Sequence, residues 1–340
     1  MKSSAHTAPR VTRGRLLERF GLLLCLLLLV LVLSLVTDRF LTVDNLTNVV
    51  RQSSINAIIA VGVMLVILTR GIDLSVGSVL AFSSVFGTTW LTQGGVPVPV
   101  AILLSVGAGV VLGLTSGALV AYLRIPPFIA TLGMMTFARG AALAYTEGQP
   151  VSGLAGGYRW AGAGELLGVP VPIVLLALVY LLGYLLLEHT GPGRSIRAIG
   201  DNPEAARWSG LPVRRVQLLV YGISGGLAAL AGVILAGRLN SAQPTAGVFY
   251  ELDAIAAVVV GGTSFAGGKG SLSGTLIGAL LIASINNGMN LLNFPADLQA
   301  IAKGAVIILA LLLYRQLRRT RPGRAVRAPT PNENPQPHPS

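Results

Sequence analysis

Apolar runs close to 20 residues long follow one another along this chain, with short polar turns between them. A helix of about 20 apolar residues is long enough to cross the hydrocarbon core of a bilayer. The pattern predicts an all-α polytopic membrane protein with ten transmembrane helices. The expected crossings are residues 17–36, 53–69, 74–91, 97–121, 126–146, 170–187, 217–237, 253–267, 272–291 and 298–314.

The composition agrees with this prediction. Of the 340 residues, 53% are hydrophobic and 11% are charged, whereas an ordinary soluble domain has about 25% charged residues. The single cysteine, Cys25, lies in the first apolar run, and the histidines His6, His189 and His338 lie in polar tails or a loop. We therefore expect no disulfide framework, no metal site and no cofactor.

The net charge of +12 is concentrated in the N-terminal arm 1–16, the central loop 188–216 and the C-terminal tail 315–340. These blocks do not interleave aromatic residues along a groove, so nucleic acid is not an expected partner. The positive-inside rule places all three blocks, and hence both termini, in the cytoplasm. A transmembrane domain, 17–314, then separates the arm from a tail that we expect to be disordered. The links expected to face outward are 37–52, 92–96, 147–169, 238–252 and 292–297.

A weak internal repeat is one interpretation of a match between two parts of the chain. A shift of 197 residues places 55–58 on 252–255, and the same shift pairs Gly71 with Gly268. Chance matches are common in sequence rich in Gly, Ala and Leu, so the repeat remains one of two alternatives.

Residues 69–78, TRGIDLSVGS, place two charges at the turn between the second and third expected crossings. Asp73 would cap the start of the third helix, and Arg70 would meet the carbonyl end of the second. Alternatively, the turn lines or gates a translocation path, because glycine-interrupted segments at matching positions of two halves mark such paths. The residues concerned are Arg70, Gly71, Asp73, Ser75 and Gly77.

The sequence offers no energy source for transport. Residues 262–270, GTSFAGGKG, fail the phosphate-loop pattern because Gly268 stands where the lysine is required. Ion-coupled carriers bury several partnered carboxylates, and the carboxylates near membrane depth here lie at expected helix ends. We predict no catalytic residue and no enzyme activity; an ion-coupled secondary transporter is the less favoured alternative.

The central loop contains the sequence GDNPEAARWSGLP at 200–212. Asp201 or Asn202 can cap a short helix there, Pro203 suits its first turn, and Gly210 stops it. The helix would present Arg207 and Trp208 on the cytoplasmic surface. It is either an ordinary surface helix or the site against which a partner ATPase pushes.

This segment resembles a signature of bacterial ABC-importer permeases, in which Glu-Ala-Ala is followed after three residues by Gly. The later Ile-x-Leu-Pro of that signature is not evident here. The resemblance implies a coupling helix that docks into the ATPase. The residues assigned to coupling are Asp201, Asn202, Glu204, Ala205, Ala206, Arg207 and Gly210.

Four further stretches resemble the ribose/xylose/galactose-type sugar ABC permeases, in order from about residue 40 to 315. They are GIDLSVGS at 71–78, TLGMMTFARG at 131–140, YELDAIAAVVVGGTSFAGGKGS at 250–271 and NNGMNLL at 286–292. Branched-chain amino-acid permeases, the nearest alternative, typically carry an Asn-Leu-Ala-His-Gly-like stretch where this chain has residues 73–77. The resemblance therefore favours a monosaccharide as substrate.

The resemblance also implies an assembly in the bacterial inner (plasma) membrane. It consists of two permease subunits, as a homodimer or pseudo-dimer, two copies of a cytoplasmic ABC ATPase, and a periplasmic or lipid-anchored sugar-binding protein. ATP would be hydrolysed on the partner subunit. The binding protein would dock on the outer links, above all 147–169 and 238–252.

Two interpretations stay open for the other polar residues near membrane depth. Arg139 either snorkels to the interface or faces the translocation path. Tyr250, Glu251 and Asp253, at the expected outer start of the eighth crossing, either cap it or contact the binding protein or pathway rim. Asn286 and Asn287 either join helices or line the sugar path.

Overall fold

Helices make up nearly all of the structure, which is a computed structural model and describes residues 13–295, 297–302, 304–305 and 308. In this part of the chain the helices are α1 (Arg13–Val36), α2 (Val43–Leu68), α3 (Val76–Thr92), α4 (Val98–Ala121), α5 (Pro127–Tyr145), α6 (Gly156–Ala163), α7 (Val171–His189), α8 (Gly191–Asp201), α9 (Pro203–Trp208), α10 (Val213–Leu239), α11 (Tyr250–Val260) and α12 (Leu272–Leu291). The strands are β1 (Val151–Ser152), β2 (Glu165–Leu166), β3 (Val169–Pro170) and β4 (Ser241–Ala242).

Among the described residues, six helices are long and apolar enough to cross a membrane: α2, α4, α5, α7, α10 and α12. Shorter apolar helical stretches occur at Gly21–Val36 and Val76–Thr92. The predicted class, a mostly helical polytopic membrane protein, is therefore confirmed. The count of ten and the cytoplasmic placement of both termini stay predictions, since about half of the tenth expected crossing and most of the two terminal segments lie outside the described residues.

The eighth expected crossing, 253–267, is wrong as a continuous span. Helix α11 has 11 residues, which at about 1.5 Å per residue cover only about half of a bilayer core of roughly 30 Å. The chain after α11 turns through Gly262, Gly267 and Gly268, all with positive φ. A run that is apolar in composition is thus interrupted by backbone conformations that an α-helix cannot contain.

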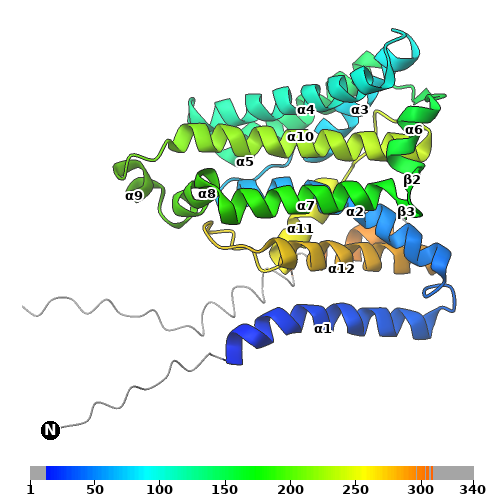
Figure 1. Cartoon of the computed structure of the whole chain (residues 1–340), viewed down its shortest axis with the longest axis horizontal. Helices are drawn as coiled ribbons and strands as arrows, with labels where there is room; N and C mark the ends of the chain where they lie inside the picture. The colour runs from blue at the N-terminus through cyan, green and yellow to red at the C-terminus, as the bar shows by residue number, and fades with distance from the viewer. Residues whose placement is uncertain (1–12, 296, 303, 306–307, 309–340) are drawn as a thin grey trace, which may run out of the picture.

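The long helices lie side by side and roughly along one direction (Figure 1). Helices α8 and α9 project at one end of this bundle, and α6 lies with β2 and β3 at the opposite end (Figure 1). The predicted orientation makes the α8–α9 end cytoplasmic. In the most apolar 18-residue stretch of each helix, 83% of the residues are buried in α2 and 72% in α10, against 22% in α4. Helices α2 and α10 therefore form the centre.

Proline and polar side chains mark where the crossings begin. A proline stands in the first turn of α4, α5 and α7, where its missing N–H costs no hydrogen bond. Thr42 caps α2 by accepting a hydrogen bond from the Asn45 N–H. The prolines explain why the predicted and observed starts of α4, α5 and α7 agree closely. The predicted start of α2 at residue 53 is wrong: the helix begins at Val43, so most of the expected outer link 37–52 is helical.

Two segments inside the bundle are not helical. Residues 71–75, between α2 and α3, form no regular secondary structure, and residues 240–249, between α10 and α11, contain β4 and a series of turns. The second segment was expected to be an exposed outer link, yet Ala242, Pro244 and Gly247 within it are buried. Proline and glycine prevent a helix here, so the pattern of residues resembles that of a surface loop.

The two outer links expected to receive a binding protein are joined to each other. Strand β1 in the link 147–169 pairs antiparallel with β4, and the Leu154 N–H donates to Asn240 Oδ1 at 3.2 Å. Helix α6 in the same link packs on α10, with Tyr158 fully buried. The link is therefore a small folded cap and not a flexible loop.

The central loop contains two helices, whereas the sequence predicted one. The additional helix is α8, which Thr190 caps through the Gly193 N–H. Its Ile196 and Ile199, three residues apart, are fully buried. This helical spacing of two isoleucines was the available signal for α8.

Candidate functional site

The non-helical segment 71–75 carries backbone polar groups into the protein interior, and neighbouring helices satisfy them. The Ile72 carbonyl accepts hydrogen bonds from Thr131 Oγ1 of α5 at 3.2 Å and from the Tyr221 hydroxyl of α10 at 3.4 Å. Non-helical backbone at membrane depth is stable only when protein groups or water supply such partners. The segment is thus held from two sides by helices that are distant in sequence.

Asp73 lies within this segment and is 1% exposed. Its Oδ1 accepts hydrogen bonds from the Ser75 N–H at 3.0 Å and the Ser75 hydroxyl at 2.6 Å, and its Oδ2 accepts one from Ser224 Oγ at 2.7 Å. The N-cap of α3 is Ser75, with no side-chain capping bond, so the prediction that Asp73 itself caps α3 is wrong. Asp73 instead joins the start of α3 to the middle of α10, because its second oxygen finds a serine there.

The beginnings of α3 and α11 meet inside the protein. A Cβ atom at Gly77 would lie 2.2 Å from the Gly247 carbonyl oxygen and 2.6 Å from Glu251 Oε2. Only glycine permits this approach, because real Cβ contacts are longer than 3.0 Å. The positive ends of two helix dipoles therefore converge on one region, where the Glu251 carboxylate also lies.

Arg139, close to the middle of α5, fastens the non-helical segment 240–249. Its Nη1 donates hydrogen bonds to the carbonyl oxygens of Pro244 and Ala246, both at 2.7 Å. Glu251 also interacts electrostatically with Arg139. The arginine is half-buried and faces the protein interior, so the snorkelling interpretation is wrong.

Two groups of residues lie on either side of the contact between the starts of α3 and α11 and are together called the central cluster below: Asp73 with Ser75 and Ser224, and Arg139 with Glu251. Arg139 lies near the middle of α5, and Ser224 near the middle of α10. Both helices are long enough to span a bilayer, so we expect these two residues to lie within the depth of the membrane. Charged groups at this depth are costly unless they are paired or hydrogen-bonded, and they generally mark a transport pathway.

The acidic start of α11 is not at the outer surface, contrary to expectation. Asp253 is 3% exposed, and its Oδ2 accepts a hydrogen bond from Asn286 Nδ2 at 3.3 Å. Glu251 contacts the start of α3, and Tyr250 is partly buried against the core. The reason is that 240–249 descends into the protein before α11 begins.

Asn287 forms a reciprocal pair with Asn45 of α2. Asn287 Nδ2 donates to Asn45 Oδ1 at 2.8 Å, and Asn45 Nδ2 donates to Asn287 Oδ1 at 3.0 Å. The geometry is that of amides joining two helices. A role of Asn286 and Asn287 in the sugar path stays a prediction.

Arg70 follows α2, but its guanidinium group serves another helix. It donates from Nε to the Gly200 carbonyl and from Nη2 to the Asp201 carbonyl, both at 2.7 Å. These carbonyls belong to the last two residues of α8. The predicted preference of a cation for a helix C-terminus is met, though at α8 instead of α2.

Helix α9 is built as its local sequence predicts. Asn202 is the cap, and its Oδ1 accepts hydrogen bonds from the N–H groups of Glu204 and Ala205, both at 3.0 Å. Ala206 is buried against the protein, and Trp208 is 91% exposed. Glu204, Arg207 and Gly210 are exposed as well, so one face of α9 is free to bind a partner.

Comparison with known proteins identifies the architecture. Residues 45–311 match the family described as "Branched-chain amino acid transport system / permease component". The chain belongs to this permease family. It is 47% identical to the ribose import permease of Escherichia coli (strain K12) over 308 residues, which cover 89% of this chain and 95% of the relative.

Other relatives are similar over most of their length. The ribose import permease of Bacillus subtilis (strain 168) is 47% identical over 90% of this chain and 96% of its own. The xylose transport system permease of Haemophilus influenzae is 34% identical over 87% of this chain and 95% of its own. The resemblance to sugar ABC permeases is therefore confirmed, and this permease is an inner-membrane protein.

Several partners of the central cluster in this permease were not predicted from sequence. Ser224 lies in an apolar run, and Thr131, Pro244 and Ala246 contribute only a hydroxyl group or backbone carbonyls. The proline and glycine in 240–249 were the only local signal of a break. Which helices that break would contact depended on the fold.

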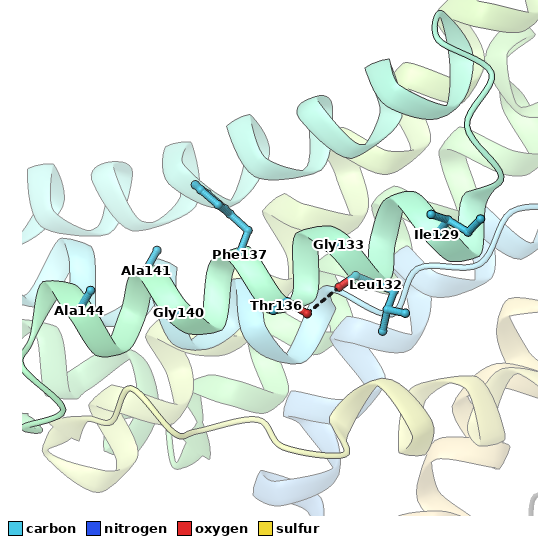
Figure 2. A pocket seen from close by; sticks show the side chains of 8 residues that line it. All are labelled: Ile129, Leu132, Gly133, Thr136, Phe137, Gly140, Ala141 and Ala144. Carbon is cyan, nitrogen blue, oxygen red and sulfur yellow. Dashed lines mark hydrogen bonds between the residues drawn. The ribbon is translucent and has the colours of Figure 1, made fainter.

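The permease also has an open apolar face on α5 (Figure 2). A hollow of about 780 Å³ lies along it. Figure 2 shows Thr136 bonded back to the Leu132 carbonyl, and the length of this hydrogen bond is 3.1 Å. Phe137 is one of the exposed side chains of this face. The lining residues are Ile129, Leu132, Gly133, Thr136, Phe137, Gly140, Ala141 and Ala144.

Proposed function

We propose that this permease is the membrane subunit of an ABC importer that moves a monosaccharide, with ribose as the first candidate. The observation that carries the proposal is the 47% identity to ribose import permeases of two bacteria across about nine-tenths of both chains. The xylose permease and a galactofuranose permease, 38% identical, are also sugar transporters by name. An amino-acid substrate, which the family description names, is the second candidate.

ATP is hydrolysed in this proposal by a separate cytoplasmic ATPase that docks on α9. The exposed Trp208 supports this assignment, because tryptophan is enriched among the residues that dominate binding energy at protein interfaces. A capped helix at the cytoplasmic end can move as a rigid body when the bound ATPase changes its conformation. The residues assigned to coupling remain those predicted from the sequence.

Two copies of the permease would form the translocation path between them. The open face of α5 supports this arrangement, since Arg139 of the same helix is absent from its lining and bonds instead to the segment 240–249. The lining contains one hydroxyl side chain, that of Thr136, so it offers a sugar few hydrogen bonds. Selection of the sugar would then rest with the binding protein.

The binding protein would dock on the outer cap formed by 147–169 together with β4. Pairing of β1 with β4 supports a direct connection from this surface to the segment 240–249. Tyr250, Glu251 and Asp253 lie deeper, so we now assign them to the polar rim of the path. Alternating access would follow from movements of the two non-helical segments between fixed helices.

Transport measurements test the proposed function. Membrane vesicles that contain the permease with its ATPase should take up radiolabelled ribose when supplied with ATP and the binding protein. Unlabelled leucine should not compete. Uptake that follows a sodium or proton gradient without the ATPase, or that carries leucine in preference to sugars, would exclude the proposal.

Charge and size changes on α9 test the docking site. Trp208→Ala should weaken binding of the ATPase about 30-fold or more, since a tryptophan at the centre of an interface contributes about 2 kcal/mol or more. Glu204→Arg should weaken it as well, by reversing a charge at the interface. Copurification of the ATPase with the tagged permease measures both effects.

The control is Asp38→Arg, which reverses an exposed charge on the outer link 37–52. It should leave copurification unchanged. Normal copurification and normal transport-coupled hydrolysis in both α9 variants would show that α9 is not the docking site.

A further inference from the structure

Three cytoplasmic turns meet at the base of the bundle. They are the turn after α2 (69–71), the end of α8 (Gly200 and Asp201) and the turn before α12 (267–269). The Gly268 N–H donates to the Leu68 carbonyl at 3.0 Å. The first and third of these turns are also the ones that the 197-residue repeat pairs.

These turns touch backbone to backbone. A Cβ atom at Gly200 would lie 1.9 Å from the Leu68 carbonyl oxygen and 2.2 Å from the Gly268 nitrogen. A Cβ atom at Gly268 would lie 2.1 Å from Asp201 Oδ1. At Gly200 no side chain lies between the end of α8 and the turn after α2, so a displacement of the end of α8 would act directly on that turn.

The Arg70 side chain adds hydrogen bonds to this contact between the three segments, which is called the cytoplasmic junction below. Its φ is +64°, a conformation that glycine adopts freely and that is unfavourable for a residue with a Cβ. The backbone of this turn would therefore favour glycine. What arginine contributes is the guanidinium group, which holds the last two carbonyls of α8 at 2.7 Å each.

The link continues in both directions from Arg70. On one side, Asn202 alone separates the end of α8 from α9. On the other side, two residues, Gly71 and Ile72, separate Arg70 from Asp73, and the Ile72 carbonyl is held by Thr131 and Tyr221. The non-helical segment 71–75 thus connects the cytoplasmic junction with the central cluster.

We propose that Arg70 is a positioning residue that transmits displacement of α9 to the segment 71–75 and so to the central cluster. This inference rests on the proposed function, because it requires the ATPase to act on α9. It gives the charged turn TRGID a role in coupling that is separate from capping α2. Arg70 touches neither ATP nor sugar in this role.

The variant Arg70→Gly tests the role of the side chain apart from that of the turn, because it removes the guanidinium group and leaves the backbone conformation possible. Glycine suits a positive φ, so the turn should form as well as before, and the thermal unfolding midpoint should not fall. Uptake of radiolabelled ribose should decrease about tenfold, within the usual range of coupling between sites. ATP hydrolysis by the assembled complex should continue, so that more ATP is consumed per sugar transported.

Arg124→Gly is the matched control. Arg124 is also an arginine with positive φ, at +56°, in the cytoplasmic turn between α4 and α5. It is exposed, and its side chain makes no recorded hydrogen bond within the described residues. This variant should keep normal uptake and normal ATP consumption per sugar.

Arg70→Lys provides a test of conservative rescue. Lysine keeps the charge but lacks the planar fork that reaches two carbonyls, so uptake should lie between that of the glycine variant and the original protein. Equal uptake by the Arg70→Gly and Arg124→Gly variants would overturn the inference. A loss of uptake that merely follows loss of assembled complex or of thermal stability would overturn it as well.

The outcomes distinguish this inference from the proposed function. If Arg70→Gly transports normally while Trp208→Ala abolishes ATPase binding, coupling through α9 holds and the role of Arg70 fails. If the ATPase binds normally to the α9 variants, the proposed docking site itself is wrong, whatever the Arg70 variants show.

Discussion

Replacing Arg139 with alanine is expected to abolish sugar uptake while the amount of permease in the membrane stays unchanged. The Arg139 side chain holds two carbonyl groups of the segment 240–249. Leaving a buried acceptor without its partner costs about 1–3 kcal/mol, and about 2 kcal/mol changes a population roughly 30-fold. The segment should therefore leave its observed position, whereas the long helices keep their packing.

Uptake of radiolabelled ribose and immunoblotting of the membrane fraction measure the two parts of this prediction. Arg139→Lys keeps the positive charge but lacks the planar guanidinium group, so it should retain partial uptake. Full activity of the alanine variant would remove Arg139 from the mechanism. If uptake and the amount of permease in the membrane fall in parallel, Arg139 is required for folding and not for transport.

Replacing Gly77 with alanine is expected to disrupt the contact between α3 and the segment before α11. The new methyl group would lie 2.2 Å from a backbone oxygen of Gly247, which cannot rotate away as a side chain can. Overpacking of this kind costs about 1–3 kcal/mol. We expect a lower thermal unfolding midpoint in detergent together with lost uptake.

Gly107→Ala is the control for this prediction. Gly107 lies within α4, and a Cβ atom there would meet nothing within 4 Å. Since alanine is about 1 kcal/mol better than glycine in a helix interior, this variant should be as stable as the original protein or slightly more so. Equal stability and uptake of the Gly77 and Gly107 variants would show that the close approach at Gly77 is not required.

The two variants act on the two sides of one structural feature. Arg139 holds the segment 240–249 through its carbonyls, and Gly77 lets the start of α3 rest against the same segment. Helix starts that meet within the membrane, with unwound chain before them, recur at substrate sites of membrane transporters. This similarity supports placing the transport pathway beside the central cluster.

Local sequence signals predicted the helices whose formation depends on residues close to one another in the sequence. Apolar runs located α4, α5, α7 and α12 closely, because a helix satisfies its own backbone hydrogen bonds wherever it lies in the membrane. Asn202, Pro203 and Gly210 located α9 through capping chemistry alone. The family resemblance likewise rested on short local motifs, and the comparisons confirmed it.

The tertiary structure alone decided which polar groups meet. The partners of Arg70, Asp73 and Arg139 lie 130, 151 and 105 residues away along the chain. A span that looks continuous by composition is broken after α11, where the Gly268 N–H finds its partner at the end of α2. By itself, the sequence thus determined a polytopic permease with a short capped helix in its central loop. Only the folded chain determined the central cluster and its connection to that helix, since hydrogen bonds between distant segments leave no periodic pattern in the residues that make them.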